Sequence, residues 1–190
     1  MRIAEINRKT KETDIKLKLN LDSDKIDIDT GVGFFDHMLE AFAFHGGFSL
    51  EVKVKGDLQV DAHHTVEDVG ICVGKAFNEA LSDKKGIERF GEAFVPMDDA
   101  LARCVLDVSR PYLNYDVLYS QEKCGEFDVC LVEEFFRALC MNANFTMHLA
   151  VLYGNNAHHE AEAVFKSAAR AIKKAIKITS NKTNSSKGVL

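Results

Sequence analysis

The chain has 190 residues, of which 46% are hydrophobic, and its formal net charge of -5 corresponds to a pI of about 5.8. This length and apolar content suffice for one good-sized domain, or for two small similar halves, with a real core. The acidic balance argues against a surface that wraps nucleic acid or lies on an anionic membrane, so we expect neither as a partner.

The cysteines and residues 1–21 indicate the cellular compartment in which we expect the chain. Five cysteines, an odd number, lie without a close CxxC pairing, which argues against a disulfide framework or a thiolate zinc site and favours the reducing cytoplasm. Residues 1–21 alternate polar and apolar residues without a continuous apolar run. We therefore expect a strand there, and neither a secretory signal nor a membrane span.

The first half of the chain predicts strands and two helices. Alternation of period two in 2–8, 13–21 and 25–29 predicts three antiparallel strands. The spacing changes to helical in 31–47 and stops at two glycines, as at a helix C-terminus. Alternation returns in 48–57, and a helix is expected from about 62 to 81 with Asp61 as its N-cap.

The second half repeats this order. Strands are expected within 93–108 and 110–119, a helix within 129–143, a strand over 145–154, and a last helix over 156–177 capped by Asn156. This predicts an internal duplication with halves 1–90 and 91–180 in one compact domain, followed by a polar tail, 181–190. The offset between the halves is 97 in the earlier helix and at the start of the strand after it, and 95 in the last helix, so one connecting loop is two residues shorter.

One short pattern, HHxxE, occurs in both halves at the start of the last helix. It comprises His63, His64 and Glu67, and again His158, His159 and Glu162. Histidine and glutamate three or four residues apart share a helix face, whereas adjacent histidines diverge by about 100°, which favours two ions over one. A single pair would be interpreted as capping or solvated residues. Its duplication favours a site for divalent transition metals, which imidazole and carboxylate commonly bind.

The duplication adds further candidate ligands. His37 aligns with Glu134, and the full set of eight is His37, His63, His64, Glu67, Glu134, His158, His159 and Glu162. Shared between two ions, this set leaves coordination positions open for water or substrate, as in catalytic sites. His148 is an alternative to Glu134 as the metal ligand. A role in packing, or in supporting a metal ligand, is favoured for His148. His45 is either a helix-end residue or a substrate contact.

The segments GFFDHMLEAFAFHG, DAHHTVEDVGICVGKAF, RFGEAFVPMDDALAR, VEEFFRALCMNA, GNNAHHEAEAVFKSAARAI and SSKGVL together resemble the imidazoleglycerol-phosphate dehydratase family of histidine biosynthesis. The resemblance covers nearly the whole chain without an added phosphatase domain. It implies an α+β fold of two split β-α-β halves, each a four-stranded sheet backed by helices. It also implies a homo-oligomeric shell of twenty-four subunits, with two manganese ions per subunit at sites completed by neighbouring chains.

The resemblance implies dehydration of D-erythro-imidazoleglycerol phosphate to imidazole-acetol phosphate. By this resemblance, bound metals would stabilise the imidazolate form of the substrate ring, which would favour loss of the adjacent hydroxyl group and would acidify the neighbouring C–H for a general base. The catalytic candidates are Glu12, Glu67 and Glu162. The implied substrate contacts are Glu12, His37, His45, His63, Glu67, Arg89, Arg110, His158, Lys166, Ser185, Ser186 and Lys187.

Several alternatives stay open. Glu12 alone could be a solvated charge at a strand edge, and Arg89 and Arg110 alone could form ordinary surface ion pairs. The chain also departs from the family pattern, because Glu134 stands where many members have histidine and a glycine common before Arg110 is missing. A dinuclear metallohydrolase and a metal-buffering shell protein are the alternative functions.

Overall fold

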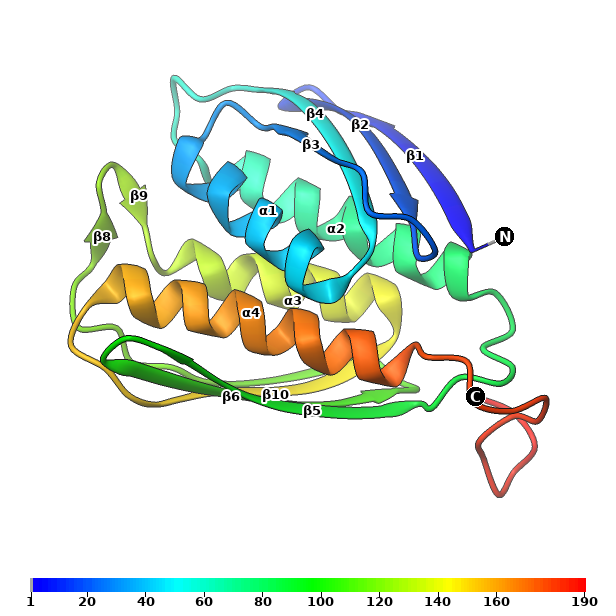
Figure 1. Ribbon diagram of the computed structural model, residues 1–190. Helices are drawn as coiled ribbons and strands as arrows, with labels where there is room; N and C mark the ends of the chain where they lie inside the picture. Colours follow the sequence, from blue (N-terminus) through cyan, green and yellow to red (C-terminus); the bar gives the residue numbers. More distant parts are fainter. Residues whose placement is uncertain (1) are drawn as a thin grey trace.

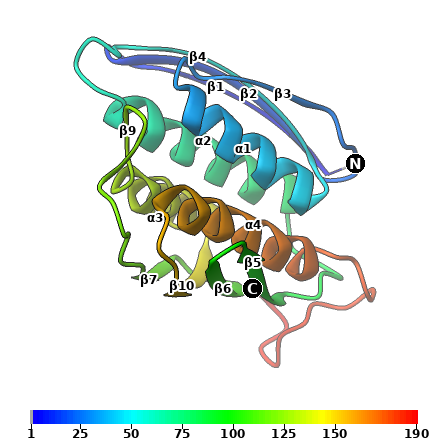
Figure 2. The same ribbon diagram turned by 60° about the vertical axis from the view of Figure 1, so that its left-hand side comes forward.

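The computed structural model describes residues 2–190, which fold into four layers (Figure 1). A four-stranded sheet forms each outer layer, and the four helices form two layers between the sheets (Figure 2). Helices α1 and α2 lie against the first sheet, and α3 and α4 against the second. The inner face of each sheet is therefore covered by the helices of its own half.

The first half contains β1 (Ile3–Lys9), β2 (Thr13–Asn20), β3 (Ile26–Asp29), α1 (Gly33–Gly46), β4 (Ser49–Gly56) and α2 (His63–Leu81). Its sheet has the order β1-β2-β4-β3. The prediction of three antiparallel strands was wrong for β3, which pairs in parallel with β4. Since α1 connects these two strands, it acts as the crossover that a parallel pair requires.

The second half contains β5 (Phe90–Met97), β6 (Ala100–Val108), β7 (Tyr112–Asp116), α3 (Leu131–Ala143), β10 (Phe145–Tyr153) and α4 (Ala157–Ala175). Its sheet order, β5-β6-β10-β7, repeats that of the first half position by position. The α+β fold with two duplicated halves is therefore confirmed. The residue limits of the halves, 1–90 and 91–180, stay a prediction.

One segment breaks the repeat. Three residues, 30–32, connect β3 to α1, whereas residues 117–130 connect β7 to α3 and form a short hairpin of β8 (Lys123–Cys124) and β9 (Phe127–Asp128). The hairpin reaches across to the first half, where the rings of Phe127 and Phe34 lie 5.1 Å apart. The sequence analysis did not foresee this hairpin, because its strands are too short for an alternation pattern.

Burial follows the predicted periodicities. In β2 the apolar side chains point inward and the lysines outward, as expected for a sheet with one solvated face. The centre of the core is a group of phenylalanines. They come from all four helices, from the start of β10 and from the position just before β4. Its fully buried members are Phe35, Phe42, Phe48, Phe77, Phe135, Phe136, Phe145 and Phe165. These rings join both halves into one core.

The two long helices begin differently. Asn156 caps α4, because its side chain accepts hydrogen bonds from the backbone N–H groups of His158 and His159, as predicted. Asp61 is not the N-cap of α2; that position is Ala62 and has no side-chain cap. The Asp61 carboxylate does accept the backbone N–H of His63 at 2.7 Å, so it still satisfies one free donor.

A search of residues 2–190 finds no helix with the length and apolarity that crossing a membrane requires.

Close packing of α2 on α3 depends on two glycines of α2, and it yields a prediction. A Cβ atom at Gly74 would lie 2.6 Å from the carbonyl oxygen of Leu139, and one at Gly70 would lie 2.7 Å from that of Phe135. Because backbone atoms cannot yield locally, Gly74→Ala should lower the free energy of unfolding by about 1–3 kcal/mol. Urea denaturation measures this change.

The matched control is Gly33→Ala at the start of α1, where an added Cβ meets nothing within 4 Å. We expect that change to stay within about 0.5 kcal/mol of the parent. Equal stabilities for the two alanine variants would contradict the close approach of α2 and α3.

Candidate active site

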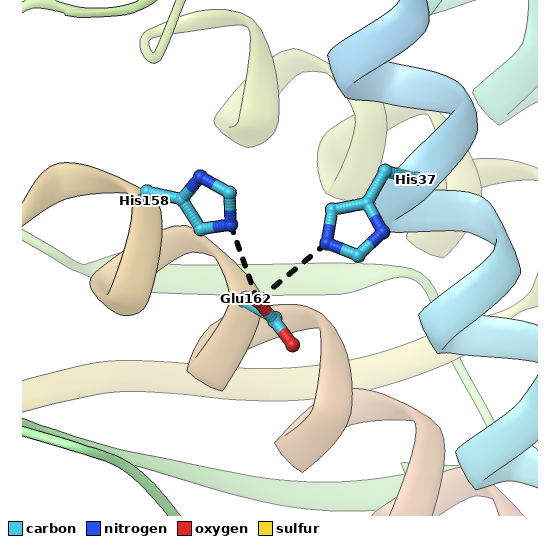
Figure 3. A group of neighbouring side chains, drawn as sticks. All are labelled: His37, His158 and Glu162. Carbon is cyan, nitrogen blue, oxygen red and sulfur yellow. Dashed lines mark ion pairs between the residues drawn. The ribbon is translucent and has the colours of Figure 1, made fainter.

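A group of three potential metal ligands lies between α1 and α4 (Figure 3). The Nε2 atoms of His37 and His158 lie 3.6 and 3.3 Å from the carboxylate of Glu162, and the donor atoms of all three residues lie within 4.8 Å of one another. His37 comes from the first half and the other two from the second. The structure thus brings together three of the eight candidate ligands.

Glu162 is the buried member of this triad, with its side chain 9% exposed, whereas both histidines are about half exposed. Burial alone would raise the pKa of Glu162. The hydrogen bond and charge of Lys166, whose Nζ lies 2.6 Å away, together with the two histidines, outweigh burial and lower that pKa. Glu162 is therefore held as a carboxylate, the form that binds metal.

The triad borders a hollow of about 460 Å³ that extends to the C-terminal part of α1. Three of the predicted substrate contacts, His37, His45 and Lys166, line it together with Glu162. Burial, followed by the positive charges of Lys166 and Arg170, lowers the pKa of His45. This histidine is therefore neutral near pH 7 and available for hydrogen bonding.

The first-half motif is more open. Nε2 of His63 lies 3.8 Å from Glu67, and both side chains are nearly half exposed. Glu134, on α3 beside α2, has Nε of Arg137 at 3.7 Å. Within residues 2–190 these three do not form a second compact triad like that of His37. The duplication predicted that these residues lie on two neighbouring helices, α2 and α3, but it did not predict the positions of their side chains.

The second histidine of each motif points elsewhere, as the divergence of neighbouring residues predicted. The rings of His158 and His159 stand 77° apart, and those of His63 and His64 73° apart. Nδ1 of His64 lies 3.0 Å from Asp57, and Nδ1 of His159 lies 2.5 Å from Asp99. These hydrogen bonds raise the pKa of both histidines.

Two further acids approach the Nε2 atoms of these histidines. Glu12, in the β1–β2 turn, lies 3.8 Å from His64, and Asp98, in the β5–β6 turn, lies 3.6 Å from His159. The sequence pattern pointed to Glu12 but not to Asp57, Asp98 and Asp99. Overlaying the two hairpin turns would have pointed to the acids at 98 and 99, since that turn is the repeat of the one that holds Glu12.

The inserted segment fixes the start of α4. Gln121 accepts the backbone N–H of Ala157 at 2.8 Å and donates to the carbonyl oxygen of Asn155 at 3.3 Å. Ser120 donates from both N and Oγ to the Glu160 carboxylate. The Phe34 ring meets the His158 ring edge to face at a centroid distance of 5.2 Å. These contacts give the second-half motif a support that the first half lacks.

The C-terminal tail, which holds three of the predicted phosphate contacts, lies at the end of the molecule opposite to the start of α4 (Figure 1). The backbone N–H of Arg89 donates to Ala175, the last residue of α4, and its guanidinium pairs with Asp107 and donates to the carbonyl oxygen of Asn184. Seventeen residues of helix separate Ala175 from His158, a distance of about 25 Å along the axis.

Arg110 also lies at this distant end. Its carbonyl oxygen accepts from Thr146 at the start of β10, whereas the end of β10 leads into α4. The tail residues Ser185, Ser186 and Lys187 follow directly after Asn184, which binds Arg89. The structure thus gathers Arg89, Arg110 and the tail at one end and the HHxxE motifs at the other.

His148 lies on the exposed, outer face of the second sheet, where its ring is 5.6 Å from that of Tyr112. Because the helices cover the other face of that sheet, His148 lies apart from the triad of its own chain.

The donor set fits a divalent metal. Two imidazole nitrogens and an ionised carboxylate converge in the triad, and this mixture suits first-row transition ions. Hydrogen bonds at Nδ1 also leave Nε2 of His64 and His159 as the free ring nitrogen.

Comparison with known proteins identifies the family. The imidazoleglycerol-phosphate dehydratase model matches residues 30–172. The chain belongs to the imidazoleglycerol-phosphate dehydratase family. It is 56% identical to the enzyme of that name from Gluconobacter oxydans, over 92% of this chain and 89% of the relative. It is 54% identical to that of Streptococcus thermophilus over the full length of both.

Solved structures agree with this membership. Imidazoleglycerol-phosphate dehydratase from Staphylococcus aureus has a TM-score of 0.86 at 43% identity, with 93% of this chain and 99% of that chain covered. The enzyme from Pyrococcus furiosus, in complex with (S)-C348, has a TM-score of 0.85 at 40% identity, with 97% of this chain and 100% of that chain covered. The predicted family and its enzyme class, a hydro-lyase, are thereby confirmed.

The cap of α4 yields a prediction for the site. Asn156→Ala removes the acceptor for the backbone N–H groups of His158 and His159, so it should lower the free energy of unfolding by about 1 kcal/mol. Urea denaturation of the metal-free protein measures the loss. Asn156→Asp, which keeps an acceptor oxygen at the same place, is the control, and a loss as large as that of the alanine variant would contradict the capping role.

Proposed function

We propose that the protein catalyses the metal-dependent dehydration of D-erythro-imidazoleglycerol phosphate to imidazole-acetol phosphate in histidine biosynthesis. The observation that carries the metal dependence is the triad of His37, His158 and Glu162, whose donor atoms lie within 4.8 Å of one another. The family membership supports the reaction and the pathway. The five free cysteines fit the cytoplasm as the corresponding location.

The metal ligands in this proposal are the eight residues of the two motifs and their helix partners. They are His37, His63, His64, Glu67, Glu134, His158, His159 and Glu162, and they would hold two Mn²⁺ ions per subunit. When bound, the ions would polarise the imidazole ring of the substrate and stabilise its anionic form. Glu134 replaces an imidazole by a harder oxygen donor, which favours manganese over zinc or copper.

The chain's own residues would handle the proton transfers. Glu12 is half exposed, and its carboxylate lies 3.8 Å from Nε2 of His64, so it can accept a proton from a substrate carbon near the metals. Glu67 and Glu162 are the other proposed catalytic carboxylates. Lys166, paired with Glu162 at 2.6 Å, would hold that carboxylate ionised and present a positive charge to the substrate.

Phosphate recognition would use the cationic end of the chain. Arg89, Arg110 and the tail residues Ser185, Ser186 and Lys187 supply directional donors for phosphate oxygens. These groups lie about 25 Å from the HHxxE motif of the same chain, too far for one small substrate to reach both. We therefore propose that active sites form between chains, with the arginine end of one subunit beside the metal motifs of another, in a twenty-four-subunit shell.

The two alternative functions explain less of the chain. A dinuclear metallohydrolase would use the same ligands but would release phosphate without forming a ketone. An inert metal-buffering shell gives no role to His45 and Lys166, which line the hollow beside the triad. Metal removal, with assays for ketone and for phosphate, tests both alternative functions.

Metal removal tests the proposed reaction directly. Protein stripped with a chelator should lose ketone formation from imidazoleglycerol phosphate and should regain it on titration with Mn²⁺, with the end point near two ions per chain. A second assay follows inorganic phosphate in the same samples. Undiminished ketone formation after stripping would contradict metal dependence, and phosphate release without ketone would favour the hydrolase.

The role of Glu134 gives a second prediction. Glu134→His should tighten binding of softer metals, so the affinity for Zn²⁺ should rise relative to that for Mn²⁺, because imidazole is the softer ligand. Competition with a chromogenic chelator measures both affinities. Glu133→His, one residue earlier on α3, is the control, because Glu133 pairs with Arg137 and is not a proposed ligand. Unchanged affinities for both metals in Glu134→His would contradict ligation by residue 134.

A further inference from the structure

Two aspartates outside the proposed ligand set hold the outer histidine of each pair. Asp57 lies 3.0 and 3.2 Å, through its two oxygens, from Nδ1 of His64, and Asp99 lies 2.5 Å from Nδ1 of His159. An ionised carboxylate can only accept a hydrogen bond, so Nδ1 of each ring carries the proton. Nε2 is then the atom with a free lone pair.

We propose that Asp57 and Asp99 are positioning residues, which fix the tautomer and ring orientation of His64 and His159 so that Nε2 faces a metal ion. This inference rests on the metal dependence proposed above. A carboxylate behind a metal-binding imidazole restricts its rotation and raises its basicity as a ligand, and loss of such a partner typically weakens metal binding 10–100-fold.

The two halves reach this arrangement from different positions in the fold. Asp57 directly follows β4, and the equivalent position in the second half, 97 residues later, is Gly154. The second half has no aspartate there and a loop two residues shorter. Asp99 comes instead from the turn between β5 and β6. Both histidines thus have the same partner chemistry at the same ring atom although the partners are not repeat equivalents.

The fold fixes the Asp99 carboxylate and the backbone of Asp57. Asp99 accepts the backbone N–H of Asn155 at 2.6 Å, which ties it to the loop before α4. The backbone N–H of Asp57 donates to the backbone carbonyl oxygen of Glu12 at 3.0 Å, which ties the β4–α2 loop to the β1–β2 turn. The side chains of Asp57 and Asp99 are only 17% and 34% exposed. Their orientation is therefore set by the protein itself.

The test compares three isosteric variants, Asp57→Asn, Asp99→Asn and Asp61→Asn. Mn²⁺ is titrated into chelator-stripped full-length protein, and the free ion is measured by electron paramagnetic resonance. We expect the first two variants to bind at least one ion 10–100-fold more weakly. Asp61→Asn is the matched control: it removes the same charge beside the first motif, but an amide oxygen can still accept the backbone N–H of His63.

A second measurement separates positioning from folding. The melting temperatures of the metal-free variants should stay near that of the parent, while the rise in melting temperature on adding Mn²⁺ should shrink, because that rise depends on the affinity. In addition, Asp99→Asn should cost no further affinity in a His159→Ala background, since no ring is left to orient.

The outcomes distinguish this inference from the proposed function. If the parent protein binds Mn²⁺ and depends on it, but both aspartate variants bind like the parent, the positioning role is overturned and the metal-dependent reaction stands. An undiminished effect of Asp99→Asn in the His159→Ala background also overturns it. If the parent protein binds no Mn²⁺, the proposed metal dependence fails and this inference fails with it.

Discussion

The site depends on one helical constraint: two adjacent residues at the start of an α-helix point about 100° apart. In α4 this turns His158 toward α1 and Glu162, and His159 toward the β5–β6 turn. Two neighbouring histidines therefore face two separate groups of side chains. The capped start of α4 makes the direction of both rings definite, because the side chain of Asn156 binds the N–H groups of these two residues.

The layered fold converts this local divergence into a site that spans both halves. Since the helices stack between the two sheets, α1 of the first half lies on α4 of the second, and α2 lies on α3. His37 consequently meets the motif of the other repeat. Each half alone would present a helix start without its partner carboxylate or imidazole. The hairpin segment 117–130 adds an asymmetry, because Gln121 braces only the start of α4.

Periodicity and repetition predicted most of the fold and the three residues that meet in the triad. The alternating strands, the four helices and the duplicated order could be read from the sequence, because burial on one face leaves a period of 2 or 3.6. The parallel pairing of β3 could not, since alternation does not encode strand direction. Asp57 and Asp99 were missed because they stand in turns, where no periodicity marks a side chain that reaches another element. The separation of Arg89 from the motifs was equally hidden, since it depends on where α4 ends.

The separation of the arginines from the HHxxE motifs within one chain has the widest consequence for the site. A helix of 19 residues places its ends almost 30 Å apart, and the fold puts the ionised and imidazole donors at one end of α4 and the guanidinium groups at the other. A substrate with only a few bonds between its ring and its phosphate cannot bridge that distance. One continuous core joins both halves, and the length of α4 itself sets the separation of its two ends. In the proposed shell, complementary ends on separate copies would remove the difficulty, because the arginine end of one subunit would complete the motif end of a neighbour.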